Sequence, residues 1–232
     1  MALELSKIVL RQEAFELRAD WQIMPQSRLA VIGPSGAGKS TLLSLIAGFL
    51  QPVSGQVIWQ GKPITNLAPS QRPVAMLFQD GNLFPHLTVW QNAALGVSPS
   101  LKLTSEDKTH VEQALERVGL ADYAARNPSD LSGGQQSRVA LARVLLQDKP
   151  LLLLDEPYAA LGPALKQQML ELVSEIADER GAGVIMVSHD PQDAKRFADE
   201  VVLVADGQAD APRKTDDIFA NPPEALRAYL GG

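Results

Sequence analysis

The sequence contains no cysteine, so it can form neither a disulfide bond nor a thiolate metal site, an absence that suits a reducing compartment. It also lacks an excess of basic residues. With a net charge of −6, a nucleic-acid partner is not expected, because such proteins concentrate Lys and Arg on one surface. No apolar run approaches the roughly 20 residues that a membrane-spanning helix needs. Aromatic residues make up only 5% of the chain, and we interpret its three tryptophans as packing residues rather than as stacking platforms.

The apolar residues that are present, 45% of 232, suffice for a sizeable core. Short apolar runs alternate with segments of helical periodicity, and this alternation predicts an α/β fold with a mostly parallel sheet covered on both faces. The expected buried strands are 29–32, 74–78, 151–154, 184–188 and 201–205. The expected helices are 39–47, 135–147, 164–180, one capped by Thr104 with Asp107, and one starting at Asp190-Pro191.

The remaining segments have different patterns. Residues 1–25 and 53–60 alternate apolar and polar side chains, which predicts an antiparallel β edge. Residues 87–148 contain no convincing strand, so we expect a helical lobe inserted into an α/β core made of 1–86 and 149–232. The segment 206–224 is rich in Asp and Pro, and we expect it to be loose.

A glycine-rich loop with the sequence GPSGAGKS occupies positions 33–40. It matches the phosphate-binding pattern G-x-x-x-x-G-K-[ST] and lies between an expected strand and an expected helix, which is the context that this motif requires. Its glycines let backbone N–H groups surround phosphate oxygens at the positive end of the helix. Lys39 would reach the β- and γ-phosphates of ATP, and the Ser40 hydroxyl would bind Mg²⁺. The predicted nucleotide-binding residues are Gly33, Pro34, Ser35, Gly36, Ala37, Gly38, Lys39, Ser40 and Thr41.

Polar residues follow three of the expected strands, at the edge where an α/β sheet binds its ligands. Asp155 and Glu156 are adjacent and should point to opposite sides, so we expect Asp155 to hold Mg²⁺ and Glu156 to act as general base toward water. His189 is positioned to contact a γ-phosphate, and Gln79 to bind Mg²⁺ or water. An acidic strand end that only caps a helix is the alternative for the Asp-Glu pair alone, but the phosphate loop favours catalysis.

A second glycine-rich turn, Leu131 to Gln135, reads LSGGQ and precedes an apolar helix. Ser132, Gly133, Gly134 and Gln135 therefore form another anion-binding helix start. For the tripeptide alone, a simple turn into a core helix is an adequate explanation. One nucleotide does not need two such cradles from one compact domain, so we expect each to be half of a site that a second copy of the chain completes.

These motifs, in this order, resemble the ATP-binding-cassette (ABC) ATPases, and the resemblance covers essentially the whole chain. It implies a head-to-tail homodimer in which Ser132–Gln135 of one copy closes over the ATP bound at Lys39 of the other. It also implies that Gln79 and the segment 80–89 contact an integral membrane permease, which in turn meets a periplasmic substrate-binding protein. The chain would then lie peripherally on the cytoplasmic face of the inner membrane, and closure on ATP would move the permease.

Three stretches, 69–79, 82–89 and 95–103, resemble the ATP-binding subunits of thiamine importers of Gram-negative bacteria. None of them would touch the transported solute, so this inference rests on analogy. The alternatives are an importer of another small solute (polyamine, iron, sulfate or sugar) and a non-transport ABC ATPase. A GTPase is disfavoured because the sequence has no Asn-Lys-x-Asp motif for guanine.

The chain departs from the family pattern at three places, one of which is Gln136-Ser137, where Arg-Gln is commoner after the signature. Ala159 and Gly162 replace the Ser and Asp that usually follow the catalytic carboxylates, and that Asp normally helps couple the two sites of the dimer. A subunit that binds ATP without hydrolysing it is the corresponding alternative. The usual adenine-stacking Tyr is missing; Gln12 lies about where it would fall, and Phe15 is the nearest aromatic residue.

Overall fold

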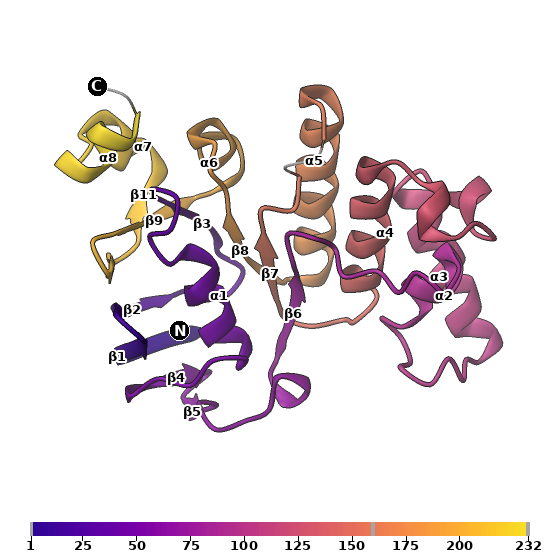
Figure 1. The fold of residues 1–232 in the computed structure, drawn as a ribbon, viewed down its shortest axis with the longest axis horizontal. Coiled ribbons are helices and arrows are strands. Elements are labelled where there is room, and N and C mark those ends of the chain that lie inside the picture. Colours follow the sequence, from indigo (N-terminus) through magenta and orange to yellow (C-terminus); the bar gives the residue numbers. More distant parts are fainter. Residues whose placement is uncertain (1, 159–160, 231–232) are drawn as a thin grey trace.

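The computed structural model describes residues 2–158 and 161–230, and these residues form a single 11-stranded sheet with helices on both faces (Figure 1). The strand order is β5-β4-β1-β2-β10-β9-β3-β8-β7-β6, with β11 beside β9. The parallel part comprises β3 (Arg28–Ile32), β6 (Val74–Leu77), β7 (Leu151–Asp155), β8 (Gly183–Val187) and β9 (Glu200–Ala205). All five strands were expected from their apolar runs, and the structure confirms them.

The register of the parallel strands determines which loops lie together. Val31 of β3 pairs with Val187 of β8, and Val187 pairs with Asp155 of β7. Leu77 of β6 pairs with Leu154 of the same strand β7. The loops that follow β3, β6, β7 and β8 therefore leave the sheet at one edge. The phosphate loop, Gln79, Glu156 and His189 lie in these four loops, and Asp155 is the last residue of β7.

The antiparallel edge is also confirmed. Strands β1 (Leu3–Gln12), β2 (Phe15–Ile23), β4 (Ser54–Trp59) and β5 (Lys62–Pro63) pair antiparallel at one end of the sheet. Alternate residues of these strands point to one hydrophobic cluster, which also contains one face of the parallel strands and the apolar side of α1 (Lys39–Ala47). Helix α1, which follows the phosphate loop, is therefore held against the sheet by buried apolar residues.

The other face of the sheet packs against the remaining helices in a second hydrophobic cluster. These helices include α2 (Val89–Ala94), α3 (Ser105–Arg117), α4 (Gly133–Leu145), α5 (Pro163–Arg180) and α6 (Pro191–Phe197). Short 3-10 turns occur at Pro69–Gln71 (η1), Ala121–Tyr123 (η2) and Pro128–Asp130 (η3). Helices α2, α3 and α4 lie together beyond β6, at the right of Figure 1. Between β6 and β7 the chain forms helices and turns, and the structure describes no strand there, as expected.

The predicted helix starts are confirmed by their capping hydrogen bonds. The Thr104 hydroxyl accepts from the Asp107 backbone N–H at 3.1 Å at the start of α3. The Asp190 carboxylate accepts from the Gln192 N–H at 2.9 Å at the start of α6. Such bonds satisfy N–H groups that have no partner within the helix.

The expectation of a loose segment at 206–224 is wrong. That segment forms β10 (Gln208–Ala209), β11 (Arg213–Lys214) and α7 (Thr215–Ala220), and α8 (Glu224–Leu230) follows. Ala209, Ile218 and Leu226 are each at most 1% exposed. These few well-spaced apolar residues anchor the segment, while its Asp and Pro residues lie at turns and exposed positions. The composition of the segment, which is rich in Asp and Pro, does not reveal the spacing of these apolar residues.

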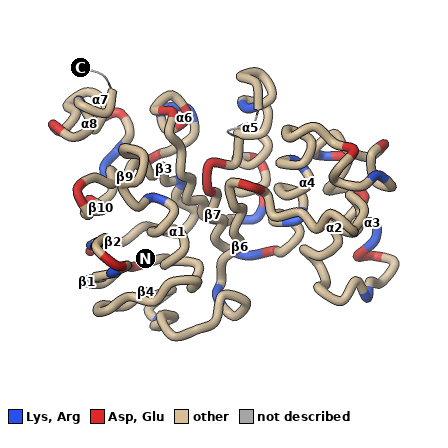
Figure 2. Tube along the Cα trace, in the orientation of Figure 1, with Lys and Arg blue, Asp and Glu red and all other residues tan. Residues whose placement is uncertain are grey.

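Charged residues are distributed over the whole fold. Figure 2 shows acidic and basic residues interspersed along the trace, at the sheet end and at the helical end alike. Among the residues that the structure describes, no helix has the length and apolar character needed to cross a bilayer.

Candidate nucleotide-hydrolysis site

The phosphate loop is shaped by glycines whose neighbours leave no room for a side chain. Gly33 has a φ of 149°, and a Cβ atom there would lie 2.0 Å from the Val204 carbonyl oxygen. Gly38 has a φ of 103°, and its Cβ would lie 2.5 Å from the Phe15 ring. Both positions therefore require glycine. The loop bends sharply between β3 and α1 and presents its backbone to the outside at Pro34–Gly36, which are exposed.

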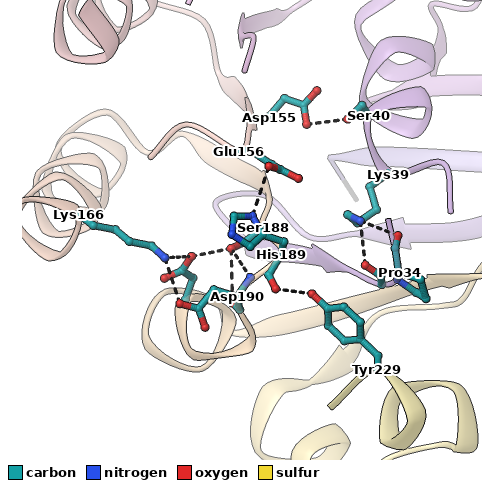
Figure 3. Close-up of polar contacts among 12 residues, drawn as sticks. Pro34, Lys39, Ser40, Asp155, Glu156, Lys166, Ser188, His189, Asp190 and Tyr229 are labelled. Atoms are coloured by element: carbon teal, nitrogen blue, oxygen red, sulfur yellow. Dashed lines mark hydrogen bonds and ion pairs between the residues drawn. The ribbon is translucent and has the colours of Figure 1, made fainter. Parts of the chain in front are cut away.

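Lys39 lies across this loop. Its ammonium donates to the carbonyl oxygens of Gly33 and Pro34, each at 2.8 Å, and the residue is only 7% exposed (Figure 3). Burial lowers the pKa of Lys39, and the carboxylates of Glu156 and Asp155 oppose this effect. The ammonium thus lies where the loop, the helix start and the two carboxylates converge.

Ser40 and Asp155 come together from α1 and β7. The Ser40 hydroxyl donates to the Asp155 carboxylate at 2.9 Å. Asp155 is 6% exposed, and burial raises its pKa, whereas the Ser40 hydrogen bond lowers it. A hydroxyl and a carboxylate are hard oxygen ligands of the kind that Mg²⁺ prefers. The two side chains therefore fit a magnesium ion.

Gln79 is less closely integrated into this group. It is exposed and lies two residues past Leu77 of β6, whose partner on β7, Leu154, lies two residues before Glu156. Within the described residues, its side chain makes no hydrogen bond to Ser40 or Asp155. The sheet therefore brings Gln79 to the correct edge without fixing its side chain.

Glu156 and His189, which follow the neighbouring strands β7 and β8, contact each other. The His189 Nδ1 atom lies 3.3 Å from a Glu156 carboxylate oxygen (Figure 3). Glu156 adopts a left-handed backbone, with a φ of 45°, and its N–H donates to the Val187 carbonyl at 3.1 Å. A non-glycine residue in this region is uncommon and often marks a functional position. This turn directs the Glu156 side chain toward β8 and away from the Ser40–Asp155 pair.

A polar network that the sequence did not reveal supports these two residues. The Ser188 hydroxyl donates to Asp193 at 2.5 Å. The Lys166 ammonium lies 2.7 Å from Asp193 and 3.1 Å from Asp190, and so ties α5 to α6 (Figure 3). Lys166 is far from the other members in sequence and belongs to no recognisable motif, so only the tertiary fold identifies it.

The second glycine-rich turn begins helix α4, with Ser132 as its N-cap. The Ser132 hydroxyl accepts from the Gln135 N–H at 3.3 Å, and the Gln135 side chain accepts from the Ser132 N–H at 2.8 Å. Within the described chain, no acceptor contacts the N–H groups of Gly133 and Gly134. Strands β6 and β7 separate this helix from α1 in Figure 1, so one copy of the chain does not bring its two glycine-rich turns together.

Two of the three departures from the family pattern have different structural outcomes. Gly162 caps α5 with a φ of −68°, and a Cβ atom there would meet none of the described residues within 4 Å. Ala159 lies outside the described residues. Phe15 packs its ring against Gly38, at the foot of the phosphate loop, whereas Gln12 is exposed at the end of β1.

A glycine loop between a central parallel strand and a helix, with a Ser–Asp pair and a Glu–His pair at the same sheet edge, defines a P-loop nucleotide-binding protein. Comparison with known proteins narrows this class. The model of the ABC transporter family matches residues 18–159. The chain belongs to this family, and it is an ATP-binding ABC-type ATPase.

Individual relatives extend the similarity beyond the family model. A thiamine import ATP-binding protein ThiQ from Cereibacter sphaeroides is 59% identical over 229 residues, covering 99% of each chain. The ThiQ of a Ruegeria species is 57% identical, again over 99% of each chain. Among solved structures, a dimeric ATP-binding cassette in a post-hydrolysis state with bound ADP and Pi superposes with a TM-score of 0.82. It is 27% identical and covers 92% of this chain and 98% of its own.

Proposed function

We propose that this chain is the ATP-hydrolysing, energy-coupling subunit of a thiamine importer. The observation that carries the proposal is the contact between Glu156 and His189 at the mouth of the phosphate loop, 3.3 Å between Nδ1 and the carboxylate. The solute is inferred from the named relatives, which are 59% and 57% identical over 99% of the chain. An importer of another small solute shares all of this site and is the second candidate.

In the proposed reaction the phosphate loop binds ATP. Backbone N–H groups of residues 33–41 surround the phosphates, and Lys39 turns from the Gly33 and Pro34 carbonyls to the β- and γ-phosphates. Ser40 and Asp155, with Gln79 at their side, would hold Mg²⁺, and this ion would neutralise phosphate charge. These residues orient the γ-phosphorus toward the Glu156–His189 pair.

Glu156 and His189 then take part in the chemical step. The Glu156 carboxylate accepts a proton from a water molecule as the water oxygen bonds to the γ-phosphorus, and the bond from that phosphorus to the ADP oxygen breaks. His189 donates a hydrogen bond to the γ-phosphate oxygens and, through its contact with Glu156, fixes the direction in which the base points. The products are ADP and phosphate.

The site needs a second copy of the chain to close. The N–H groups of Gly133 and Gly134 and the Ser132 hydroxyl form an exposed anion-binding helix start on a support that is apolar and buried. In a head-to-tail dimer, this start from one copy covers the γ-phosphate held by the other. The dimeric cassette with bound ADP and Pi, which is 27% identical, supports such an arrangement.

The loop after Gln79 is the proposed contact with the membrane permease. Phe49 and Phe84 are 53% and 46% exposed, and the Phe49 ring packs at a tilt against Phe78 with ring centroids 5.4 Å apart. Exposed aromatic groups of this kind are typical of docking surfaces. Arg143 of α4 donates to the carbonyls of Gly81 at 2.7 Å and Asn82 at 2.9 Å, so the loop is tied directly to the helix that starts at Gly133.

This connection gives a physical route from ATP to transport. Closure of α4 over ATP on the second copy moves the loop at 80–89 through Arg143, and the loop moves the permease. The lobe at 87–148 acts as the moving part against the core at 1–86 and 149–232. A periplasmic substrate-binding protein delivers the solute from the other side, and the chain lies on the cytoplasmic face of the inner membrane.

The test is hydrolysis by the chain reconstituted with a permease and a substrate-binding protein. We expect thiamine to stimulate phosphate release and polyamines, iron, sulfate and sugars to leave it unchanged. Glu156→Gln should abolish release while ATP binding persists. Stimulation by a different solute would transfer the function to the second candidate, and release at the parent rate by Glu156→Gln would contradict the assigned base.

A further inference from the structure

Tyr229 of helix α8 contacts the main chain at the catalytic site. Its hydroxyl donates a hydrogen bond to the His189 carbonyl oxygen, from a position 40 residues further along the chain (Figure 3). Burial raises the pKa of Tyr229, and the negative charges of Asp190 and Glu156 raise it further, so the phenol stays protonated and remains a donor. No sequence motif indicated this residue.

Helix α8 is anchored well enough to hold such a contact in place. Leu226 is completely buried, and the Tyr229 ring packs against the same hydrophobic cluster. The preceding α7 is fastened to α6 because Ile218 is buried and the Thr215 hydroxyl donates to the Ala198 carbonyl at 2.6 Å. Since α6 begins directly after His189, this C-terminal pair of helices and the catalytic loop share one support.

Among the residues that the structure describes, three contacts hold His189 and its loop, and Tyr229 supplies the one that comes from α8. Glu156 contacts its imidazole. On its N-terminal side, the Ser188 hydroxyl is bound by Asp193 and accepts from the Asp190 N–H at 3.0 Å. Tyr229 binds its carbonyl. Rotation of the His189 peptide plane moves the imidazole, so a donor on that carbonyl fixes where the side chain points.

We propose that Tyr229 is a positioning residue for ATP hydrolysis, through which helix α8 orients His189 toward the γ-phosphate. This inference rests on the proposed function, because it assigns Tyr229 a role only through the imidazole of His189. The competing explanation is that Tyr229 merely fills the cluster with its ring. The variant Tyr229→Phe distinguishes the two explanations, because it keeps the ring and removes the hydroxyl donor.

The experiment compares the full chain with Tyr229→Phe, and with Tyr123→Phe as the matched control. Tyr123 lies in the helical lobe, where its ring contacts Arg126, far from the site. We expect Tyr229→Phe to lower kcat for Mg-ATP by roughly fivefold, the effect of losing one neutral hydrogen bond that aligns a reacting group. KM for ATP and the thermal unfolding midpoint should match the parent, because the phosphate loop and the cluster are untouched. Tyr123→Phe should behave as the parent.

A double-mutant cycle with His189→Ala decides whether Tyr229 acts through the imidazole. We expect Tyr229→Phe to have no further effect on kcat in the His189→Ala background. An equal loss in both backgrounds, or a parental kcat for Tyr229→Phe alone, would overturn the role of Tyr229 and leave the proposed function intact. If the parent chain releases no phosphate with or without its membrane partner, both the proposed function and this inference fail.

Discussion

Helices α1 and α4 make an instructive comparison, because both begin at a glycine-rich turn and yet serve different halves of one proposed site. At the start of α1, Lys39 and Ser40 already bond to carbonyls of the loop and to Asp155 of the same chain. At the start of α4, the Ser132 side chain hydrogen-bonds, among the described residues, only to Gln135 of its own first turn. The first turn of α1 is thus built into the core, and that of α4 faces outward. This contrast is what a site shared between two copies requires.

The two helices resemble each other at the opposite end. The C-terminal carbonyls of α1 accept from the completely buried guanidinium of Arg72, at 2.8 Å to both Leu45 and Ile46. The last carbonyl of α4, that of Leu145, accepts from Arg180. A cation at this end satisfies carbonyls that have no partner in the helix and complements the helix dipole. In both helices, therefore, an arginine side chain holds the C-terminal end, opposite the glycine-rich turn that we propose to bind an anion.

Lys39→Ala should have the largest effect and should break the α1 half. Charge-assisted hydrogen bonds contribute about 1.5–3 kcal/mol each, so we expect ATP affinity to fall by about a hundredfold. Equilibrium binding of a fluorescent ATP analogue measures this. Parental affinity would show that the loop holds phosphate without its lysine.

Ser132→Ala should break the α4 half and leave the α1 half intact. We expect ATP affinity of the single chain to stay at the parental value and phosphate release to fall by roughly tenfold, as charge-assisted contacts to the transition state are lost. Ser129→Ala, in the turn just before, is the control. A weaker ATP affinity in Ser132→Ala would contradict the division of the site into two halves.

Arg72→Met tests the support behind α1. Its guanidinium also donates to the partly buried carbonyls of Leu67 at 3.2 Å and Thr65 at 2.5 Å, and a methionine would leave all of these acceptors without their guanidinium donor. Each such loss costs about 1–3 kcal/mol, so we expect the free energy of unfolding to drop by about 3 kcal/mol. Chemical denaturation measures it. Arg213→Met on an exposed strand should change it little, and an unchanged stability in Arg72→Met would refute the capping role.

Gly162→Asp should have the smallest effect and would sharpen the comparison. A side chain at Gly162 meets none of the described residues within 4 Å, and Asp is a favoured N-cap residue, so α5 should tolerate or gain stability from it. We expect the Hill coefficient of ATP hydrolysis to rise toward two-site cooperativity, because an Asp here couples the two sites in the ABC ATPases that this chain resembles. If Gly162→Ser and Gly162→Asp both leave the Hill coefficient unchanged, residue 162 does not take part in coupling the two sites.

The sequence predicted those parts of the molecule whose physical cause is local. Apolar runs predicted the five parallel strands, and the glycine spacing of 33–40 predicted the loop between β3 and α1. Glu156 and His189 were each predicted to follow a strand, but their contact with each other was not predicted, because the sequence did not reveal that β7 and β8 are neighbours. The roles of these residues, and the lobe boundaries at 87 and 148, stay predictions.

What the sequence could not predict depends on pairings between distant segments. Three contacts join elements that are far apart in the chain, and no periodicity in the sequence predicts them. They are Lys166 with Asp193, Arg72 with the end of α1, and Tyr229 with His189. The same limit explains the error at 206–224, where Ile218 fixes a short helix in a segment that its composition marks as loose. Tertiary packing, and not amino-acid composition, determines the structure of that segment.

Cross-linking tests most directly whether ATP joins the phosphate loop of one copy to the N-terminal turn of α4 in another. The chain has no cysteine, so single Ser35→Cys and Ser129→Cys chains carry one thiol each, both in the Glu156→Gln background. With a flexible bis-maleimide, a mixture of the two should give a product containing one of each chain when ATP is present. Without ATP, or with Lys39→Ala in both chains, that product should disappear. Its absence with ATP, or an equal yield without ATP, would contradict the shared site.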